Sequence, residues 1–275
     1  MAGNSSDEGV GRREESEDGV KKPLVSVVMP AYNSAATLSA ALESALSQQV
    51  SVEILLMDDC STDEIDAVLE RFRKYPQIRY ERNEKQMGAA KSRNRAVKKA
   101  RGTYVAFLDS DDYWAPGKLK KQIQNMEQKK CALCCTAREL MKPEGELTGK
   151  VIGVKEQITY RDLLRHNSIN CSSVLLRTEV AREFPMAHED SHEDYITWLR
   201  LLKKNGIAIG INEPLLKYRL TNSGKSGSKL KSAVMTFRVY RYMGFSWPKS
   251  AVCFISYALH GVWKYLTAGW KKIET

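Results

Sequence analysis

Short apolar runs alternate with segments of helical periodicity along the first 110 residues of the chain. Each run is too short for a helix and is rich in strand-forming residues, so it predicts a buried strand. Alternating strands and helices are typical of a doubly wound sheet with parallel strands. The strands are expected at 24–29, 54–57, 78–80 and 103–108, and the helices at 38–47, 64–74 and 88–100.

The pattern becomes less regular after about residue 128. A helix is predicted at 193–204, because Ile196, Leu199 and Leu202 recur with helical spacing. The apolar part of the last helix falls short of the ~20 residues that a bilayer requires, which predicts an interfacial or packed helix. Strands or turns are expected at 131–136, 172–177, 206–210 and 214–219, a mobile loop at 221–229, and tail helices at 230–243 and 248–266.

Polar residues follow three of the early strands, which should place them at one edge of the sheet, where such folds bind ligands. Asp109 and Asp111 are two residues apart and could close on one hard cation, Mg²⁺ or Mn²⁺. The alternative is a solvated turn that caps the next helix. The three polar segments are Tyr32-Asn33, Asp58-Asp59 and Asp109-Ser110-Asp111-Asp112.

Composition bounds the class of protein. An apolar fraction of 43% in 275 residues is enough for a real core. Six cysteines do not make a disulfide framework in a chain of this size. Cys131, Cys134 and Cys135 are better explained by a buried strand than by zinc, because no second pair stands at ligand spacing. Residues 1–22 are polar and expected to be disordered, and the lack of an apolar N-terminal segment indicates a cytoplasmic protein.

The net charge of +10 is concentrated in the tail, where residues 217–275 hold eleven Lys or Arg and one acid, Glu274. The tail also holds aromatic residues such as Trp247 and Phe254, a combination that suits an anionic membrane surface. A soluble helix with a solvated basic face is the alternative. Nucleic acid is not expected as a partner, because no nucleic-acid motif appears.

The chain lacks both G-x-G-x-x-G after its first strand and a G-K-[ST] loop, which disfavours dehydrogenases and excludes P-loop NTPases. Any phosphates must then be held by metal and basic side chains. Over about 24–220 the chain resembles the family 2 glycosyltransferases. The segments that carry this resemblance are Val25-Ser-Val-Val-Met-Pro-Ala-Tyr-Asn33, Asp58-Asp-Cys-Ser61, Gly88-Ala-Ala-Lys-Ser-Arg-Asn94, Leu108-Asp-Ser-Asp-Asp112 and Glu193-Asp-Tyr195 before Trp198.

The resemblance implies an α/β GT-A fold, a Rossmann-like doubly wound mixed sheet, here with a C-terminal helical membrane-associating extension. Residues 23–128 would bind the nucleotide sugar, 129–220 the acceptor, and 221–275 would form a basic amphipathic helical tail. The implied activity is inverting transfer of one sugar, from a UDP-sugar donor to a glycan or lipid-linked acceptor in bacterial O-antigen, capsule or teichuronic acid synthesis. Such an enzyme would sit peripherally on the inner face of the plasma membrane. The alternative is a catalytically silent nucleotide-sugar-binding or scaffold subunit there.

The resemblance also assigns site residues. Pro30, Ala31 and Tyr32 would line the nucleotide base, and Asp59 would accept from a pyrimidine ring N–H. Arg93 would face the diphosphate. Asp111 would bind Mn²⁺ or Mg²⁺, and Asp109 would reach the ribose or the metal.

Asp194 corresponds to the catalytic base of the family. Burial beside apolar side chains and a nearby Glu193 would raise its proton affinity. Glu193, His192 and Trp198 are candidates for acceptor or secondary contacts. His188 or His192 could touch the acceptor or the metal, although loop histidines are more often bystanders. The chain departs from the family pattern at Thr221, where members often carry His; Lys225 and Lys229 could substitute by charge.

Overall fold

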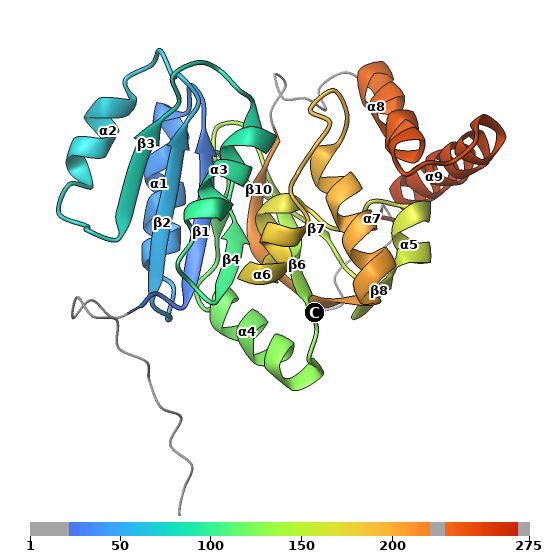
Figure 1. The fold of residues 1–275 in the computed structure, drawn as a ribbon, viewed down its shortest axis with the longest axis horizontal. Coiled ribbons are helices and arrows are strands. Elements are labelled where there is room, and N and C mark those ends of the chain that lie inside the picture. The colour runs from blue at the N-terminus through green and yellow to red at the C-terminus, as the bar shows by residue number, and fades with distance from the viewer. Residues whose placement is uncertain (1–21, 221–228, 269–275) are drawn as a thin grey trace, which may run out of the picture.

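A computed structural model describes residues 22–220 and 229–268, with side chains at 22–220 and 230–259 (Figure 1). The expected disordered N-terminal tail and the loop after residue 220 lie almost entirely outside these described residues. So do Thr221 and Lys225, and the side chain of Lys229.

One mixed sheet forms the centre of the molecule, in the order β3-β2-β1-β4-β9-β6-β10-β5, with β7 beside β6 and β8 beside β10. The first four strands are parallel to one another, as the alternating pattern predicts. β9 is antiparallel to both β4 and β6, so the second half departs from a purely parallel sheet. The strands are β1 Val25–Ala31, β2 Val52–Asp58, β3 Ile78–Arg82, β4 Tyr104–Phe107, β5 Tyr113–Trp114, β6 Leu133–Met141, β7 Leu147–Ile152, β8 Gln157–Thr159, β9 Leu175–Arg177 and β10 Ile207–Arg219.

Helices cover both faces of this sheet. Successive residues of β1 point to opposite faces, so that Val27 and Met29 pack with α1, α2 and α4, while Val28 packs with α3 and α7. Figure 1 shows α8 and α9 at the end of the molecule opposite α2. The helices are α1 Ala35–Leu46, α2 Ile65–Arg71, α3 Ala89–Lys99, α4 Lys118–Lys129, α5 Tyr160–Arg165, α6 Thr178–Glu183, α7 Glu193–Asn205, α8 Lys229–Tyr242 and α9 Trp247–Ala268.

Three of the strands predicted from the sequence differ in the structure. The expected strand at 172–177 begins with a 3₁₀ turn, Cys171–Ser173, and only Leu175–Arg177 is extended. The two strands expected at 206–210 and 214–219 are one strand, β10, with an irregularity between Ile211 and Leu216. Pro214 lies in that irregularity, where its missing N–H breaks no ladder hydrogen bond.

The cysteine-rich segment is a buried strand, as predicted: Cys134 and Cys135 lie in β6 with no exposed surface. Among the residues that the structure describes, no helix combines the length and apolar character needed to cross a membrane.

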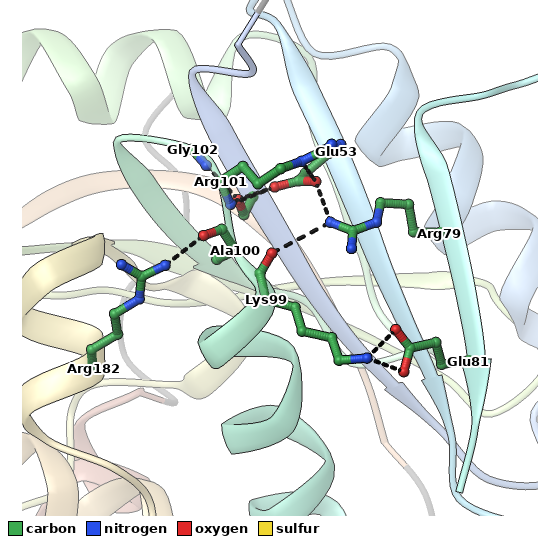
Figure 2. A network of polar contacts seen from close by, with 9 residues as sticks. Glu53, Arg79, Glu81, Lys99, Ala100, Arg101, Gly102 and Arg182 are labelled. Carbon is green, nitrogen blue, oxygen red and sulfur yellow. Dashed lines mark hydrogen bonds and ion pairs between the residues drawn. The ribbon is translucent and has the colours of Figure 1, made fainter. Parts of the chain in front are cut away.

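A buried carboxylate ties the turn between α3 and β4 to the sheet. Glu53 of β2 is 2% exposed, and its oxygens accept hydrogen bonds from the Arg101 backbone N–H at 2.7 Å and from Ser26 Oγ at 2.7 Å. Figure 2 shows the guanidinium groups of Arg79 and Arg101 beside the same carboxylate. This turn lies at the amino end of β4, so the contact fixes the strand that leads to Asp109.

Candidate active site

The polar segments predicted to converge do follow adjacent strands. β2, β1 and β4 are neighbours and parallel, so Asp59, Tyr32 and Asp109 all follow carboxyl ends at the same edge of the sheet. Arg93 of α3 connects this edge to α7. Its guanidinium donates to Asp109 Oδ1 at 2.5 Å and to Glu193 Oε1 at 3.2 Å.

Arg93 is 5% exposed and therefore an internal bridge between two acidic segments 84 positions apart in the sequence, Asp109 and Glu193. Burial lowers its pKa, but the charges of Asp109 and Glu193 outweigh this and raise the pKa well above its usual value. To contact a diphosphate as predicted, the Arg93 guanidinium would have to bind it together with these carboxylates or release one of them. The structure thus gives Arg93 a role that the sequence did not indicate.

The loop after β4 is held by groups from distant segments. The Asp109 N–H donates to Ser172 Oγ at 3.1 Å, and the Arg219 N–H donates to Asp112 Oδ1 at 2.9 Å. The Arg219 guanidinium also donates to the carbonyl of Asp111 at 2.9 Å. The loop is therefore braced from both the 3₁₀ turn Cys171–Ser173 and the end of β10.

The carboxylates in this loop repel one another, although Arg93 offsets the charge of Asp109. Burial first, and then the Asp109 charge, raise the pKa of Asp111 to about 6. Burial and both neighbouring charges also raise the pKa of Asp112, whose Oδ2 is buried without a hydrogen-bond partner. Such a set of oxygens fits a hard cation.

The residues present fit a divalent metal only in part. Within the described part of the chain, no three His, Cys, Asp or Glu side chains are arranged as a ready metal cage. Mg²⁺ commonly binds through one or two carboxylates and completes its shell with water and substrate phosphates. Asp111, with Asp109, is consistent with that mode of binding.

Asp58 and Asp59 have structural partners. Asp58 is fully buried and accepts from Tyr80 Oη at 2.9 Å and from Arg82 at 3.1 Å. Asp59 is 4% exposed and accepts from Asn83 Nδ2 and the N–H groups of residues 87 and 88, all within 2.8 Å. A carboxylate has about four acceptor positions, so a pyrimidine N–H would have to displace or share a present donor of Asp59.

The segment predicted to line the nucleotide base, residues 30–32, presents one exposed side chain. Pro30 and Ala31 are buried residues of β1, and the Ala31 carbonyl accepts from the Asp59 N–H at 2.8 Å. Tyr32 is 48% exposed and is the ring of this segment that is accessible for stacking. The next residue, Asn33, has a φ of +49° and its side chain accepts from the Thr62 N–H at 2.7 Å. The turn is thus fixed while Tyr32 projects outward.

Asp194 lies in the first turn of α7, next to Glu193. Burial first, and then the Glu193 charge, raise the pKa of Asp194 to about 6, while Arg93 and His192 oppose the shift. Its Oδ1 accepts from the Tyr195 N–H at 2.7 Å. A carboxylate with raised proton affinity that remains ionised at neutral pH is suited to general-base chemistry.

The prediction that Trp198 contacts the acceptor directly is wrong. Trp198 has no exposed surface and its ring lies 5.9 Å from that of Phe107, inside the core. Its spacing within α7 placed it on the buried face, and the sequence could not distinguish that face from the site. His192 approaches the Ser232 carbonyl at 3.4 Å, and His188 stacks on Tyr242 at 3.7 Å. Both histidines contact α8.

Four further residues hold the site together but were not predicted. Three of them hydrogen-bond a predicted site residue, and Asn94 bonds Met186 in the segment before α7. Asn94 lies in a segment that carries the family resemblance and Arg219 in a predicted strand, so only their partners were missed. Asn83 and Ser172 had no signal in the sequence. The contacts are Asn83 to Asp59, Asn94 to Met186, Ser172 to Asp109 and Arg219 to Asp112.

Known proteins resemble this chain in both sequence and fold. A family model described as Glycosyl transferase family 2 matches residues 26–182. A Bacillus subtilis (strain 168) protein named as teichuronic acid biosynthesis glycosyltransferase TuaG is 39% identical over 89% of this chain and 98% of its own. An Escherichia coli protein, UDP-Glc:alpha-D-GlcNAc-diphosphoundecaprenol beta-1,3-glucosyltransferase WfaP, is 34% identical over 88% of this chain and 95% of its own.

Two solved structures show the same fold at low sequence identity. S. aureus TarS 1–349 in complex with UDP-GlcNAc superposes with a TM-score of 0.67 at 18% identity, covering 85% of this chain and 71% of TarS 1–349. The mannosyltransferase PcManGT from Pyrobaculum calidifontis, in complex with GDP-Man and Mn²⁺, gives 0.64 at 16% identity, covering 92% of this chain and 77% of its own. With a family model over more than half of its length and relatives along nearly all of it, the chain belongs to glycosyltransferase family 2 and has the GT-A fold.

Proposed function

We propose that this glycosyltransferase moves a single sugar, with inversion, from a UDP-sugar to a hydroxyl of a lipid-linked glycan in bacterial surface polysaccharide synthesis. Residues 23–128 would bind the donor and 129–220 the acceptor. The E. coli relative supports the substrate classes, because its name specifies a UDP-Glc donor, a diphosphoundecaprenol-linked acceptor and a β linkage. The name of the B. subtilis relative supports the pathway class.

The observation that carries the proposal is the pair of ion pairs made by Arg93. They join Asp109, in the segment proposed to hold the donor, to Glu193, the residue before the proposed base. Charges from the two halves of the chain therefore meet at one site. A transferase needs this arrangement, because donor carbon and acceptor oxygen must be held within reacting distance.

Asp194 is proposed as the general base. Its carboxylate would take the proton of the acceptor hydroxyl as the oxygen attacks the sugar carbon, and the nucleoside diphosphate would leave from the opposite side. This inverts the configuration, so an α-linked donor gives a β-linked product. The raised pKa of about 6 gives the carboxylate higher proton affinity than an exposed Asp while leaving it ionised at neutral pH.

Asp111, assisted by Asp109, is proposed to hold Mn²⁺ or Mg²⁺. When bound, the metal supplies positive charge to the diphosphate as it leaves. Tyr32 is proposed to stack on the base, since it is the exposed ring of its segment. Asp59 and Arg93 remain proposed nucleotide contacts, in addition to the structural bonds described above.

The donor proposal is tested by thermal unfolding with UDP, GDP, and a panel of their sugar conjugates, with Mn²⁺ or with a chelator. A ligand that binds only the folded state raises the melting temperature. We expect stabilisation by UDP compounds with Mn²⁺, which Asp111→Asn removes. Equal stabilisation in chelator would contradict the metal proposal, and stabilisation by GDP compounds alone would contradict the donor class. NMR of the product of a responsive α-linked donor then tests inversion, because an α product would rule it out.

We further propose that residues 221–275 contact the inner face of the plasma membrane peripherally. Val252, Ile255 and Leu259 of α9 recur at helical spacing and are 67%, 57% and 64% exposed. Trp247, the first residue of α9, is 67% exposed. Glu274 is the only acid after residue 213. An apolar face on a segment with this charge suits anionic lipid.

Membrane contact is tested by sedimentation with vesicles of phosphatidylglycerol and phosphatidylcholine. Val252→Glu should weaken binding about tenfold or more, because burying a valine side chain contributes about 1.5 kcal/mol. Salt should weaken binding as well. The matched control is Val151→Glu in β7, where the original valine is 48% exposed but far from the tail in sequence. Equal effects of the two substitutions would contradict the proposed surface.

A further inference from the structure

The loop that leads to the proposed base lies between two helices from distant parts of the chain. It follows α6 and ends at His192, directly before Glu193 and Asp194. Helix α3, on the donor side, contacts some of its residues, and helix α8, from the C-terminal tail, contacts others. The position of α8 beside α7 is visible in Figure 1.

On the donor side, Asn94 of α3 fixes the start of this loop. Its Nδ2 donates to the Met186 carbonyl at 2.6 Å, and its Oδ1 accepts from the Met186 N–H at 2.9 Å. Further along, the Glu189 carboxylate lies so close to Gly88 that a Cβ added there would collide with it. This part of the loop is therefore held by α3 without help from the tail.

On the tail side, Asp190 is bound by two side chains of α8. Tyr242 Oη donates to Asp190 Oδ2 at 2.7 Å, and Arg238 donates to Oδ2 at 3.2 Å and to the Asp190 carbonyl at 3.0 Å. The Tyr242 ring also stacks on His188, with 3.7 Å between ring centroids and 12° between planes. His188 has a φ of +67°, a conformation that a residue with a side chain keeps only when its surroundings impose it.

The residue after Asp190 adds a buried contact to the same helix. Ser191 has no exposed surface, and its Oγ donates to the Met235 carbonyl at 2.8 Å. Helix α8 can serve as a fixed support because its own Tyr240 is buried and donates to the Leu164 carbonyl at 2.8 Å. The loop thus rests on a helix that is anchored in the core.

We propose that Arg238 and Tyr242 are positioning residues for catalysis: by holding Asp190 and His188 on α8, they set the entry into α7 and so the place of Asp194. This inference rests on the proposed function of Asp194 as the base. It assigns the C-terminal tail a part in the active site that is separate from any membrane contact. Neither residue touches substrate in this scheme.

A role limited to stability is disfavoured by exposure. The Arg238 and Asp190 side chains are 48% and 49% exposed, and ion pairs this accessible to water contribute little to the stability of a fold. The double substitution Arg238→Ala with Tyr242→Phe should therefore leave the melting temperature nearly unchanged. The double substitution should affect the loop and the turnover, but not the fold as a whole.

The test measures kcat, donor affinity and amide hydrogen exchange in the full-length double variant. We expect faster exchange at 188–192 and a kcat at least about tenfold lower, since small misplacements of a catalytic group can cost this much. UDP affinity should stay within about twofold, because α3 holds the donor side independently. Arg238→Lys with Tyr242 intact should restore most of the turnover.

The matched control is Arg73→Ala, which removes another exposed pair, Arg73 with Glu70 at 3.2 Å, at the end of α2 and outside the site. It should change neither exchange at 188–192 nor kcat. Unchanged exchange in the double variant would show that α8 does not hold the loop and would overturn the inference. Faster exchange with wild-type kcat would overturn it too. Asp194→Asn distinguishes failure of the proposed function from failure of this inference. Full activity in that variant would show that Asp194 is not the base, but it would not contradict the contact between the loop and α8.

Discussion

Arg93 shows how one side chain can couple two parts of an active site. Its guanidinium is nearly inaccessible to water and is shared by Asp109 and Glu193. A buried charge is tolerated only when its partners are well placed, so each carboxylate helps to fix the other through Arg93. Because Glu193 precedes Asp194, the charge of the donor segment also affects the electrostatic environment of the proposed base.

The pH dependence of the reaction should report that environment. Asp194 acts as a base only when ionised, and its pKa is raised to about 6 by burial and by Glu193, against Arg93 and His192. The nearby Cys171 thiol is buried, which raises its pKa and keeps it neutral. We expect kcat/KM to be flat above pH 6 and to fall about tenfold per pH unit below it. A rate that stays constant well below pH 6 would contradict the assignment.

The sequence predicts side chains at this site better than it predicts their partners. Asp109 and Asp111 could be named because they follow a buried strand at the edge where such sheets bind ligands, and Asp194 because its segment resembles the family. Trp198 was misplaced because its helical spacing fits both a core face and a site face. The partners of Asp59 could not be foreseen, since the backbone N–H groups of residues 87 and 88 reach it only through the folded loop.

The turn between α3 and β4 depends on Glu53. Burial alone would raise the pKa of Glu53, but hydrogen bonds from Ser26, the Arg101 N–H and Arg79 outweigh it and lower the pKa. A carboxylate with a lowered folded-state pKa stabilises the fold above its unfolded pKa, and this contribution is lost as the pH falls through the folded value. Acid should therefore loosen this turn.

Replacing Glu53 tests the importance of that turn. Glu53→Gln should lower the free energy of unfolding at neutral pH by about 2 kcal/mol, because it weakens several charge-assisted hydrogen bonds of a buried group. Glu81→Gln is the control, drawn in the same view (Figure 2). The Glu81 side chain is 27% exposed and its partner Lys99 is 39% exposed, so the loss should be below about 1 kcal/mol. Denaturant unfolding measures both, and equal losses would contradict the account.

Elements with a strong hydrophobic pattern were predicted well, and the others were not. The strands at 54–57 and 78–80 extend to β2 and β3 with small shifts at their ends. Helix α4 was not predicted, because its sequence is rich in Lys and Gln and only residues such as Leu119 and Met126 are apolar and buried. The antiparallel insertion of β9 depends on pairing with β4 and β6, which no local pattern encodes.

The proposed site residues lie along one edge of the sheet. The segments proposed to bind the donor follow β1, β2 and β4, and α7 begins beside them through the Arg93 contacts. Helices α8 and α9 lie at the opposite end of the molecule from α2 (Figure 1).

The most direct test of this account is turnover by Asp194→Asn, measured with a donor that stabilises the wild-type protein. We expect a loss of about a hundredfold to ten-thousandfold, the usual contribution of a general base, while UDP still raises the melting temperature. The control is Asp66→Asn, which also changes an acid in the first turn of a helix but far from the site in sequence. Wild-type turnover by Asp194→Asn would contradict the proposed mechanism.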